Sequence, residues 1–368
     1  FNNIQLLHGL VKYGDWTQCT DIFQYMKTRF LRKIQKGKAY FVFDYSTEGF
    51  SPVNEFPFFD MLYFNCKKYN ISPRQIIYVS ANHRDEENIS KYTKNYNCVP
   101  IRVFSFPSFQ KVVSIDDGLG FKNDIAQLQD SVKLCNKRHT TKYLSSLSRV
   151  NRKYRSLASY LLWSSNIRDK ALISHDTVNK EYISDILIEN GYPIDHNSIN
   201  DWLDHLPLTV DQTNFELNWA LSQFPYEDIH AQTIFQIVNE TQVSDRSGTT
   251  MFYSEKTFRP MGWFQPFVIY GQPGINHYLE KLGYKLYDEW FDLSFDFETD
   301  HVKRYLLLLE EITRVSEYLD RLSKKERIQW RFKNKEILLH NFNLMKTSAN
   351  SVEKMCKFLK TLLPRSGI

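Results

Sequence analysis

Short apolar segments of strand length alternate with amphipathic segments of helical length along most of this chain. An alternation of strand and helix favours parallel sheets covered by helices on both faces, because parallel neighbours need a long crossover connection. The predicted strands, rich in aromatic and β-branched residues, lie at 39–45, 75–81, 99–106, 142–148, 170–176, 233–240 and 266–271. The predicted helices lie at 20–34, 55–70, 152–165 and 275–283. The sequence therefore predicts an α/β protein.

A polar stretch at 107–138 separates two such alternations, and we expect it to be a loop. The chain has 368 residues, which exceeds one ordinary hydrophobic core. We predict two Rossmann-like domains, 1–135 and 136–300, followed by a helical tail at 301–368 in which apolar residues recur every three or four positions. Residues 284–288 are predicted to form a last short strand.

The composition excludes several classes of protein. Apolar residues make up 42% and charged residues 24%, as in ordinary globular proteins, and the net charge of +5 permits anionic ligands without requiring them. The five cysteines form no CxxC pair, which argues against a zinc site or disulfide framework and favours a reducing, cytoplasmic location. No Gly-Lys-Ser/Thr phosphate loop and no GxGxxG after a strand is present, so a kinase or dehydrogenase is disfavoured.

The stretch YSEKTFRPMGWFQPFVIYGQPG, residues 253–274, concentrates charge just before the most apolar strand. Ser254 is predicted to cap a helix that begins at Glu255. Lys256 and Arg259 are three residues apart, share a face, and lie near a helix N-terminus that attracts phosphate. Glu255 can accept hydrogen bonds from ribose hydroxyls, so the group fits a nucleoside diphosphate. The alternative is a charged, solvated helix start.

A second basic group occurs in LSRVNRKYR, directly after the predicted strand at 142–148. Arg149, Arg152 and Arg155 are spaced by three, and Arg can bind phosphate with two parallel hydrogen bonds. We predict that they contact the same diphosphate. A solvated basic face or a nucleic-acid patch are the alternatives.

Residues 239–288 resemble the C-terminal, nucleotide-sugar half of GT-B glycosyltransferases, most closely the fucosyltransferase-like enzymes. The resemblance rests on Glu240-Thr241 (the family's Thr-Glu in reversed order), Ser254-Glu255-Lys256, the strand from Pro266 to Gly271, and Leu282-Gly283-Tyr284. The chain departs from the fucosyltransferase pattern at Arg259-Pro260, where the family has Asn.

This resemblance implies two Rossmann-like domains that face a cleft, with Glu240 among the donor-binding residues. It implies an inverting, metal-independent transferase without a cofactor, which moves a sugar from a GDP- or UDP-linked donor to a hydroxyl of a glycan or glycoconjugate.

Inversion needs a carboxylate that removes the proton of the acceptor hydroxyl. In GT-B enzymes that group usually comes from the N-terminal half, where FDYSTEGF follows the first clear strand. We predict Glu48 as the base, with Asp44 as second choice; the alternative for both is an acid that caps a turn. His83 and Arg84 follow the next strand and are predicted to bind acceptor, or else belong to a polar loop.

The remaining histidines, acidic pairs and basic run are predicted to be structural or solvated rather than catalytic. His139, His175 and His230 are isolated along the chain and are expected to be structural or at the surface. Acids pair at 115–118 and 296–300, but neither segment follows a strong strand, so no metal site is predicted. The basic run at 321–335 is predicted to be a solvated helix with Arg327, Arg331 and Lys335 on one face, or a peripheral contact with an anionic membrane.

Two other functions remain open from the sequence. The basic segments permit a glycosyltransferase that modifies nucleic-acid bases, although nucleic acid is not the expected partner. A non-catalytic nucleotide- or glycan-binding protein with the same fold is the other alternative.

Overall fold

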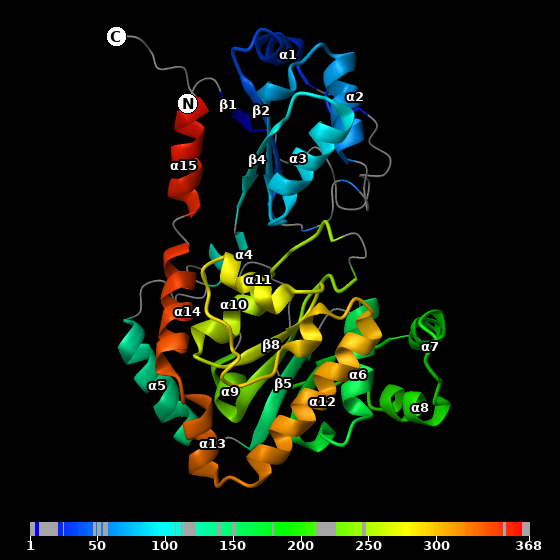
Figure 1. Ribbon diagram of the computed structural model, residues 1–368, viewed down its shortest axis with the longest axis vertical. Coiled ribbons are helices and arrows are strands. Elements are labelled where there is room, and N and C mark those ends of the chain that lie inside the picture. Colours follow the sequence, from blue (N-terminus) through cyan, green and yellow to red (C-terminus); the bar gives the residue numbers. More distant parts are fainter. Residues whose placement is uncertain are drawn as a thin grey trace. The chain divides into compact units, whose positions relative to one another are not determined.

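The computed structural model describes residues 4–6, 21–24, 26–46, 49, 53, 58–106, 108–111, 113, 123–137, 141–148, 152–178, 180–210, 226–244, 248–348 and 351–362. The chain forms two compact units. Unit 1 comprises Phe1–Ser108, Ser247–Phe252 and Asn350–Ile368, and unit 2 comprises Phe109–Arg246 and Tyr253–Ala349. Figure 1 labels their elements. Among the described helices, none is long and apolar enough to cross a bilayer.

Unit 1 contains a parallel four-stranded sheet in the order β1-β2-β3-β4. Its strands are β1 (Ile4–Leu6), β2 (Tyr40–Tyr45), β3 (Ile76–Ser80) and β4 (Arg102–Ser105). Its helices are α1 (Thr28–Gln35), α2 (Phe58–Lys68), α3 (Asp85–Tyr96) and α15 (Ser351–Leu362), and the short α4 (Ser108–Lys111) lies where the two units divide.

Successive side chains of a strand point to opposite faces, so this sheet has two separate apolar clusters. On one face Phe41, Phe43 and Tyr78 pack with Phe58 and Phe59 of α2. On the other face Val42, Ile77 and Val79 form a smaller cluster. Phe104 and Phe358 of α15 pack against this smaller cluster, with ring centroids 4.9 Å apart.

Gly248–Phe252, a short segment from much later in the chain, belongs to unit 1 and lies at the carboxyl end of β3. Asn82 Nδ2 donates to the Thr249 carbonyl (3.0 Å), and Asn82 Oδ1 accepts from Met251 N (2.9 Å). The backbone N–H of His83 donates to the Met251 carbonyl at 2.8 Å. These bonds hold the segment along the loop that follows β3.

Unit 2 contains a second parallel sheet in the order β6-β5-β7-β8. The strands are β5 (Lys142–Ser148), β6 (Ala171–His175), β7 (Thr233–Asn239) and β8 (Phe267–Tyr270). Every residue of β7 is buried, as expected of a central strand covered on both faces.

The helices of unit 2 surround this sheet (Figure 1). They are α5 (Asp124–Lys137), α6 (Lys153–Trp163), α7 (Lys180–Glu189), α8 (His196–Asp204), α9 (Tyr226–Gln232), α10 (Glu255–Gly262), α11 (Ile275–Lys281), α12 (His301–Asp320), α13 (Lys324–Arg331) and α14 (Lys335–Ser348). Short 3₁₀ turns lie at Pro73–Gln75, Arg168–Lys170 and, as η6, at Ser294–Phe297.

The predicted α/β class and all seven predicted strands up to 271 are confirmed, but the loop prediction for 107–138 is wrong. Residues Asp124–Lys137 form α5. Its buried face carries the polar Gln127 and Ser131 beside Leu128 and Cys135, so the apolar spacing of Leu128, Val132 and Cys135 is a weak signal within a polar segment.

The predicted strand at 284–288 is also wrong. Tyr284 and Tyr287 are buried there, but the described segment pairs with no strand. Instead, Lys285 N donates to Asn341 Oδ1 (2.8 Å) and Asn341 Nδ2 donates to the Lys285 carbonyl (2.9 Å). A side chain of α14 therefore satisfies the backbone groups that a neighbouring strand would otherwise bind.

The two units divide the chain differently from the predicted boundaries at 135 and 300. Helix α5 lies in unit 2, where Asn343 of α14 donates to Asp124 at 2.7 Å. Helices α12, α13 and α14 also belong to unit 2, whereas α15 belongs to unit 1.

Candidate functional site

The carboxyl edge of the unit 2 sheet brings together several charged residues that the sequence predicts for donor binding. In a parallel sheet all strands end at the same edge, and open α/β sheets bind ligands there. Glu240 directly follows β7, and Gly271 directly follows β8. A Cβ atom placed on Gly271 would lie 3.4 Å from the Cβ of Glu240, so the two loops run side by side.

Glu240 is fully buried and fixes the start of α10. Its Oε1 accepts from Ser254 N (3.0 Å) and from the Thr257 hydroxyl (2.6 Å), while Oε2 accepts from Thr241 N (3.2 Å). Three donors of this kind stabilise an ionised carboxylate away from water. Glu240 therefore positions the loop and the helix, and its oxygens are already engaged within the protein.

The predicted helix start is confirmed. Ser254 is the N-cap of α10 and accepts from Lys256 N at 3.4 Å. The helix runs through Pro260, which lacks the N–H that would reach Lys256, and ends two residues later at Gly262. The short α10 thus presents the positive end of its dipole at the carboxyl edge of the sheet, while Ser254 binds the N–H groups of Lys256 and Thr257.

Glu255 and Lys256 form an ion pair of 2.7 Å at this helix start, with 23% of each side chain exposed. Burial raises the pKa of Glu255, but the charges of Lys256 and Arg259 outweigh it and bring the pKa to about 2. Burial lowers the pKa of Lys256, against the opposing attraction of Glu255. The Glu255 carboxylate is therefore ionised at neutral pH, and part of each side chain remains within reach of a ligand.

Arg155 supplies a buried positive charge from α6. Its side chain is 3% exposed, and Nη2 donates to the Thr241 hydroxyl at 2.6 Å. Burial lowers the pKa of this guanidinium, while the nearby carboxylate of Glu240 opposes that shift. Within the described ranges, the buried Nε has no acceptor. A buried, incompletely bonded guanidinium is costly unless an anion completes it.

Together these residues make one charged cluster, defined as Arg155, Glu240, Glu255, Lys256 and Arg259. Three cations and two carboxylates give it a net charge of +1. Electrostatic contacts link Arg155 with Glu255 and Lys256, and Arg259 with Glu255. A partly exposed cationic group at a helix N-terminus is suited to binding a diphosphate.

The other predicted arginines are placed less centrally. Arg152 is the exposed N-cap residue of α6, although its charge still acts on Arg155. Arg149 lies outside the described residues.

In unit 1 the predicted acceptor-side residues have structural contacts. Asp44 is exposed at the end of β2, and its Oδ1 accepts from Ser46 N at 3.0 Å, as a turn-capping acid does. Arg84 donates to the Gly248 carbonyl. Burial lowers the pKa of His83 to about 4, so its imidazole is neutral at physiological pH. Glu48 lies outside the described residues.

Two of the three histidines have a structural role, as predicted. His175 is buried at the end of β6, with Nδ1 3.0 Å from the Ser148 carbonyl and Nε2 2.9 Å from the Ser156 hydroxyl. His230 is buried against Gln265, and burial lowers its pKa to about 3. His139 lies outside the described residues.

The paired acids at 296–300 also have partners within the protein. Asp296 binds the first turn of α11, Asp300 caps α12, and Glu298 forms an ion pair with Lys303 at 2.7 Å. The acids at 115–118 lie outside the described residues. In the described part of the chain, no three His, Cys, Asp or Glu side chains converge as metal ligands would.

The predicted solvated face at 321–335 is wrong for Arg331. The segment is two helices, so Lys335 begins α14 while Arg327 and Arg331 belong to α13. Arg331 is 1% exposed and donates to the carbonyls of Thr233 (2.8 Å), Trp263 (2.8 Å), Phe264 (3.4 Å) and His230. A residue buried in this way cannot contact a membrane.

Sequence reasoning missed Arg304, which supports the site from α12. It is 1% exposed, and its Nη2 donates to the carbonyls of Val243 and Gly271, both at 2.7 Å. It thereby joins the loops after β7 and β8. Its position in the sequence is the signal that could have found it. Arg304 lies on the same helical face as the buried His301, Tyr305 and Leu308, and a charged residue on a buried face needs partners within the protein.

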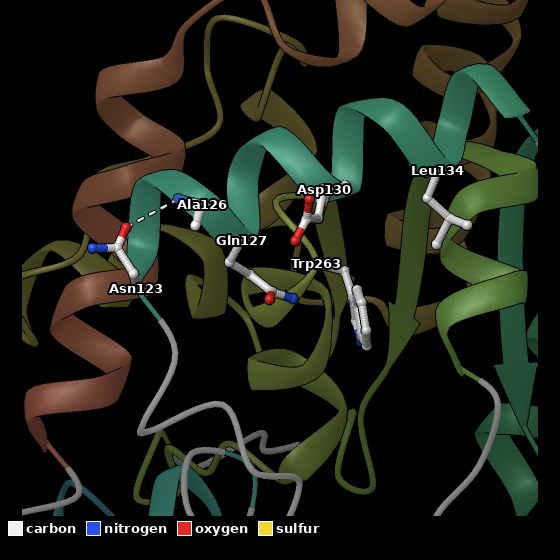
Figure 2. A pocket seen from close by; sticks show the side chains of 7 residues that line it. Asn123, Ala126, Gln127, Asp130, Leu134 and Trp263 are labelled. Atoms are coloured by element: carbon white, nitrogen blue, oxygen red, sulfur yellow. Dashed lines mark hydrogen bonds between the residues drawn. The ribbon is translucent and has the colours of Figure 1, made fainter.

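A cavity of about 450 Å³ lies beside α5 (Figure 2). One face of α5 and the ring of Trp263 form its walls. The lining residues are Asn123, Ala126, Gln127, Asp130, Ser131, Leu134 and Trp263. None of them belongs to the charged cluster.

Comparison with known proteins gives distant structural likenesses. No protein-family model and no curated protein matches the chain. A solved structure described as trehalose-6-phosphate from E. coli bound with UDP-2-fluoro glucose shares 14% identity and a TM-score of 0.44, over 91% of this chain and 71% of that one.

Two further structures are similar at the same level. An α,α-trehalose-phosphate synthase (UDP-forming) from Burkholderia vietnamiensis shares 12% identity and a TM-score of 0.39, over 91% of this chain and 72% of that one. The N-terminal domain of Candida albicans trehalose-6-phosphate phosphatase shares 11% identity and a TM-score of 0.38, over 96% and 84%.

Proposed function

We propose that this protein is a GT-B glycosyltransferase that moves a sugar from a GDP- or UDP-linked donor to a hydroxyl of a glycan or glycoconjugate, with inversion and without a metal. The observation that carries the proposal is the charged cluster. Its Arg155 has a buried Nε with no acceptor in the described residues, and the exposed edge of Lys256 lies at the start of α10. A diphosphate would complete both groups.

In the proposed reaction the acceptor oxygen forms a bond to the anomeric carbon. The bond between that carbon and the phosphate oxygen breaks, and its electron pair leaves on the nucleoside diphosphate. Arg155, Lys256, Arg259 and the N-terminus of α10 stabilise that developing charge. Cationic side chains can supply this stabilisation in place of a metal ion. Glu240 holds the helix start in position through Ser254 N and Thr257.

The acceptor proton goes to a carboxylate of the first half of the chain. Glu48 is the proposed base and Asp44 the second choice. His83 and Arg84 remain proposed acceptor contacts. Arg84 already donates to the Gly248 carbonyl, so it would hold the segment Gly248–Phe252 in place as well as bind the acceptor.

Donor binding is the first test. Lys256→Ala and Arg259→Ala should weaken binding of UDP or GDP by about ten- to a hundred-fold, since charge-assisted hydrogen bonds contribute roughly 1.5–3 kcal/mol each. Uridine and guanosine should bind both variants almost as they bind the parent. Glu255→Gln should weaken nucleoside and diphosphate binding equally, because its proposed partner is the ribose.

Isothermal titration measures all of these affinities, with Lys285→Ala as an exposed lysine control in the same unit. Unchanged diphosphate affinity in Lys256→Ala and Arg259→Ala would place the donor elsewhere.

Catalysis is the second test. Turnover of a nucleotide sugar should persist in EDTA, because protein cations carry the charge. Glu48→Gln should lower turnover by about 10²–10⁴ while donor affinity changes only a few-fold, as removal of a general base does. Loss of activity on chelation, restored by Mn²⁺, contradicts the metal-free mechanism. Near-normal turnover in Glu48→Gln moves the role to Asp44, which Asp44→Asn then tests.

A further inference from the structure

A buried carboxylate that the proposed reaction does not use lies beneath α11. Asp296, in η6, has no exposed surface. Its Oδ1 accepts from Asn276 N (3.2 Å) and Asn276 Nδ2 (2.7 Å). Its Oδ2 accepts from His277 N (3.0 Å) and His277 Nδ1 (2.9 Å). The carboxylate therefore fixes both the helix start and the ring of His277.

This contact determines which nitrogen of His277 carries the proton. The bond a histidine makes through one ring nitrogen sets the tautomer, and here Nδ1–H must donate to Asp296. The neutral ring then carries its lone pair on Nε2. The His277 side chain is 34% exposed, whereas Asp296 is completely enclosed. Nε2 of His277 is therefore an oriented hydrogen-bond acceptor on a partly exposed ring, and the buried Asp296 holds the other nitrogen of that ring.

His277 belongs to a helix that begins at the same edge of the sheet as the charged cluster. Helix α11 begins just after β8, and the hydroxyl of Tyr253 donates to the Ile275 carbonyl in its first turn at 2.6 Å. Tyr253 immediately precedes Ser254, the N-cap of α10. The segment just before α10 is thus joined to the first residue of α11 by a direct bond, and His277 lies two residues further along α11.

An exposed aromatic ring completes the surface. Phe297 is 63% exposed, and its ring centroid lies 4.6 Å from that of His277. An apolar face beside a single oriented acceptor is suited to a ligand that has both C–H surface and hydroxyl groups. A phosphate oxygen only accepts hydrogen bonds at neutral pH, so it does not match the Nε2 lone pair.

We propose that His277, held by Asp296, binds a hydroxyl of the donor's sugar ring, and that Phe297 packs against the C–H face of the same ring. This subsite rests on the proposed function. It extends that function from recognition of the diphosphate to selection of the sugar.

The experiment compares a nucleoside diphosphate with its own sugar conjugate. His277→Phe keeps a planar ring and removes the acceptor, whereas His277→Gln restores a carbonyl oxygen near the position of Nε2. Affinities for UDP, GDP, UDP-glucose, UDP-galactose, GDP-mannose and GDP-fucose are measured by titration for both variants. His205→Phe is the matched control, since His205 is another partly exposed histidine with an aspartate partner, 3.7 Å away, on α8.

In His277→Phe the affinity for the best-binding sugar nucleotide should fall about three- to ten-fold, as expected for one neutral hydrogen bond. Affinity for its nucleoside diphosphate should stay within two-fold, and His277→Gln should recover part of the loss. Equal losses for diphosphate and sugar conjugate would make His277 a phosphate contact and overturn the proposal, as would no loss at all. If neither UDP nor GDP binds the parent protein, the proposed function itself fails and the subsite with it.

Discussion

At the scale of single residues, Asp85 shows how burial competes with hydrogen bonding. The side chain has no exposed surface at the start of α3 and accepts from Ser80 Oγ (2.5 Å), Asn82 Nδ2 (2.8 Å) and Asn88 Nδ2 (2.9 Å). Burial raises the pKa of Asp85 to about 7, although each of these bonds lowers it. Asn82 and Asn88 also donate to the Thr249 carbonyl. The carboxyl group of Asp85 therefore orients the two side chains that bind the segment Gly248–Phe252.

This pKa predicts that stability depends on pH. Between about pH 4 and 7 Asp85 keeps a proton in the folded protein that it releases in the unfolded chain. The stabilisation that Asp85 gives to the folded state is therefore complete at low pH and is lost as pH rises through 7. The loss is on the order of 4 kcal/mol at most. Asp85→Asn imitates the protonated form, and its urea midpoint should therefore fall less than that of the parent between pH 5 and pH 8. Asp288→Asn, at an exposed acid, is the control; identical pH profiles for parent and Asp85→Asn contradict the assignment.

At the scale of elements, α13 is anchored by one arginine rather than by an apolar stripe alone. Arg331 donates to four carbonyls that belong to the end of α9, the start of β7 and the end of α10. Burial lowers the pKa of its guanidinium, which nevertheless remains charged. The helix therefore links three elements through backbone carbonyls, of which the Thr233 carbonyl also accepts a longer bond from Gln265 Nε2 at 3.4 Å.

Removing that anchor should be costly. Arg331→Leu removes the guanidinium from four buried carbonyls, of which Thr233 keeps only its longer bond from Gln265, and should lower the free energy of unfolding by about 3–5 kcal/mol. Arg331→Lys should cost less, because an ammonium group can still reach some of them. Arg321→Leu, at the exposed end of α12, should change stability by no more than about 0.5 kcal/mol. Chemical denaturation measures all three, and a mild effect of Arg331→Leu would mean that water replaces the guanidinium.

How far the sequence predicts these elements depends on what each one buries. Strands β3 and β7 are covered on both faces, so their residues are mostly apolar, although the buried Gln236 interrupts the apolar run of β7. Helix α10 was predicted from Ser254, a local capping signal. Helix α5 has an apolar spacing at Leu128, Val132 and Cys135, but polar Gln127 and Ser131 share its buried face and weaken that signal. Local signals cannot reveal bonds across the fold, such as Arg304 to Val243 or Asp296 to His277.

The candidate site was predictable in its residues but not in their partners. Glu255, Lys256 and Arg259 were found from spacing, and Arg155 from its basic surroundings. Glu240 was expected to face the donor, yet its oxygens bind Ser254 N and Thr257, residues on the far side of a long loop. Hydrogen bonds of this kind depend on how loops meet at the edge of a sheet. The spacing of apolar and polar residues along the chain does not predict them.

At the scale of the whole molecule, the chain passes repeatedly between its two units, at 108–109, 246–247, 252–253 and 349–350. The segment Ser247–Phe252 belongs to unit 1 although it joins β7 to α10, the two elements that carry Glu240 and Glu255. Neither unit is a continuous stretch of sequence. Cutting the chain at a single point therefore cannot release either unit intact.

The position of α15 in unit 1 has a consequence during translation. Strands β1 to β4 leave the ribosome early, but Phe358, which packs on Phe104 and the cluster of Val42, Ile77 and Val79, is made only after all of unit 2. Until then that face of the first sheet stays open, and chaperones that bind exposed apolar surface can recognise the nascent chain. A truncated product that ends before α15 keeps this face uncovered and so remains a target for quality control.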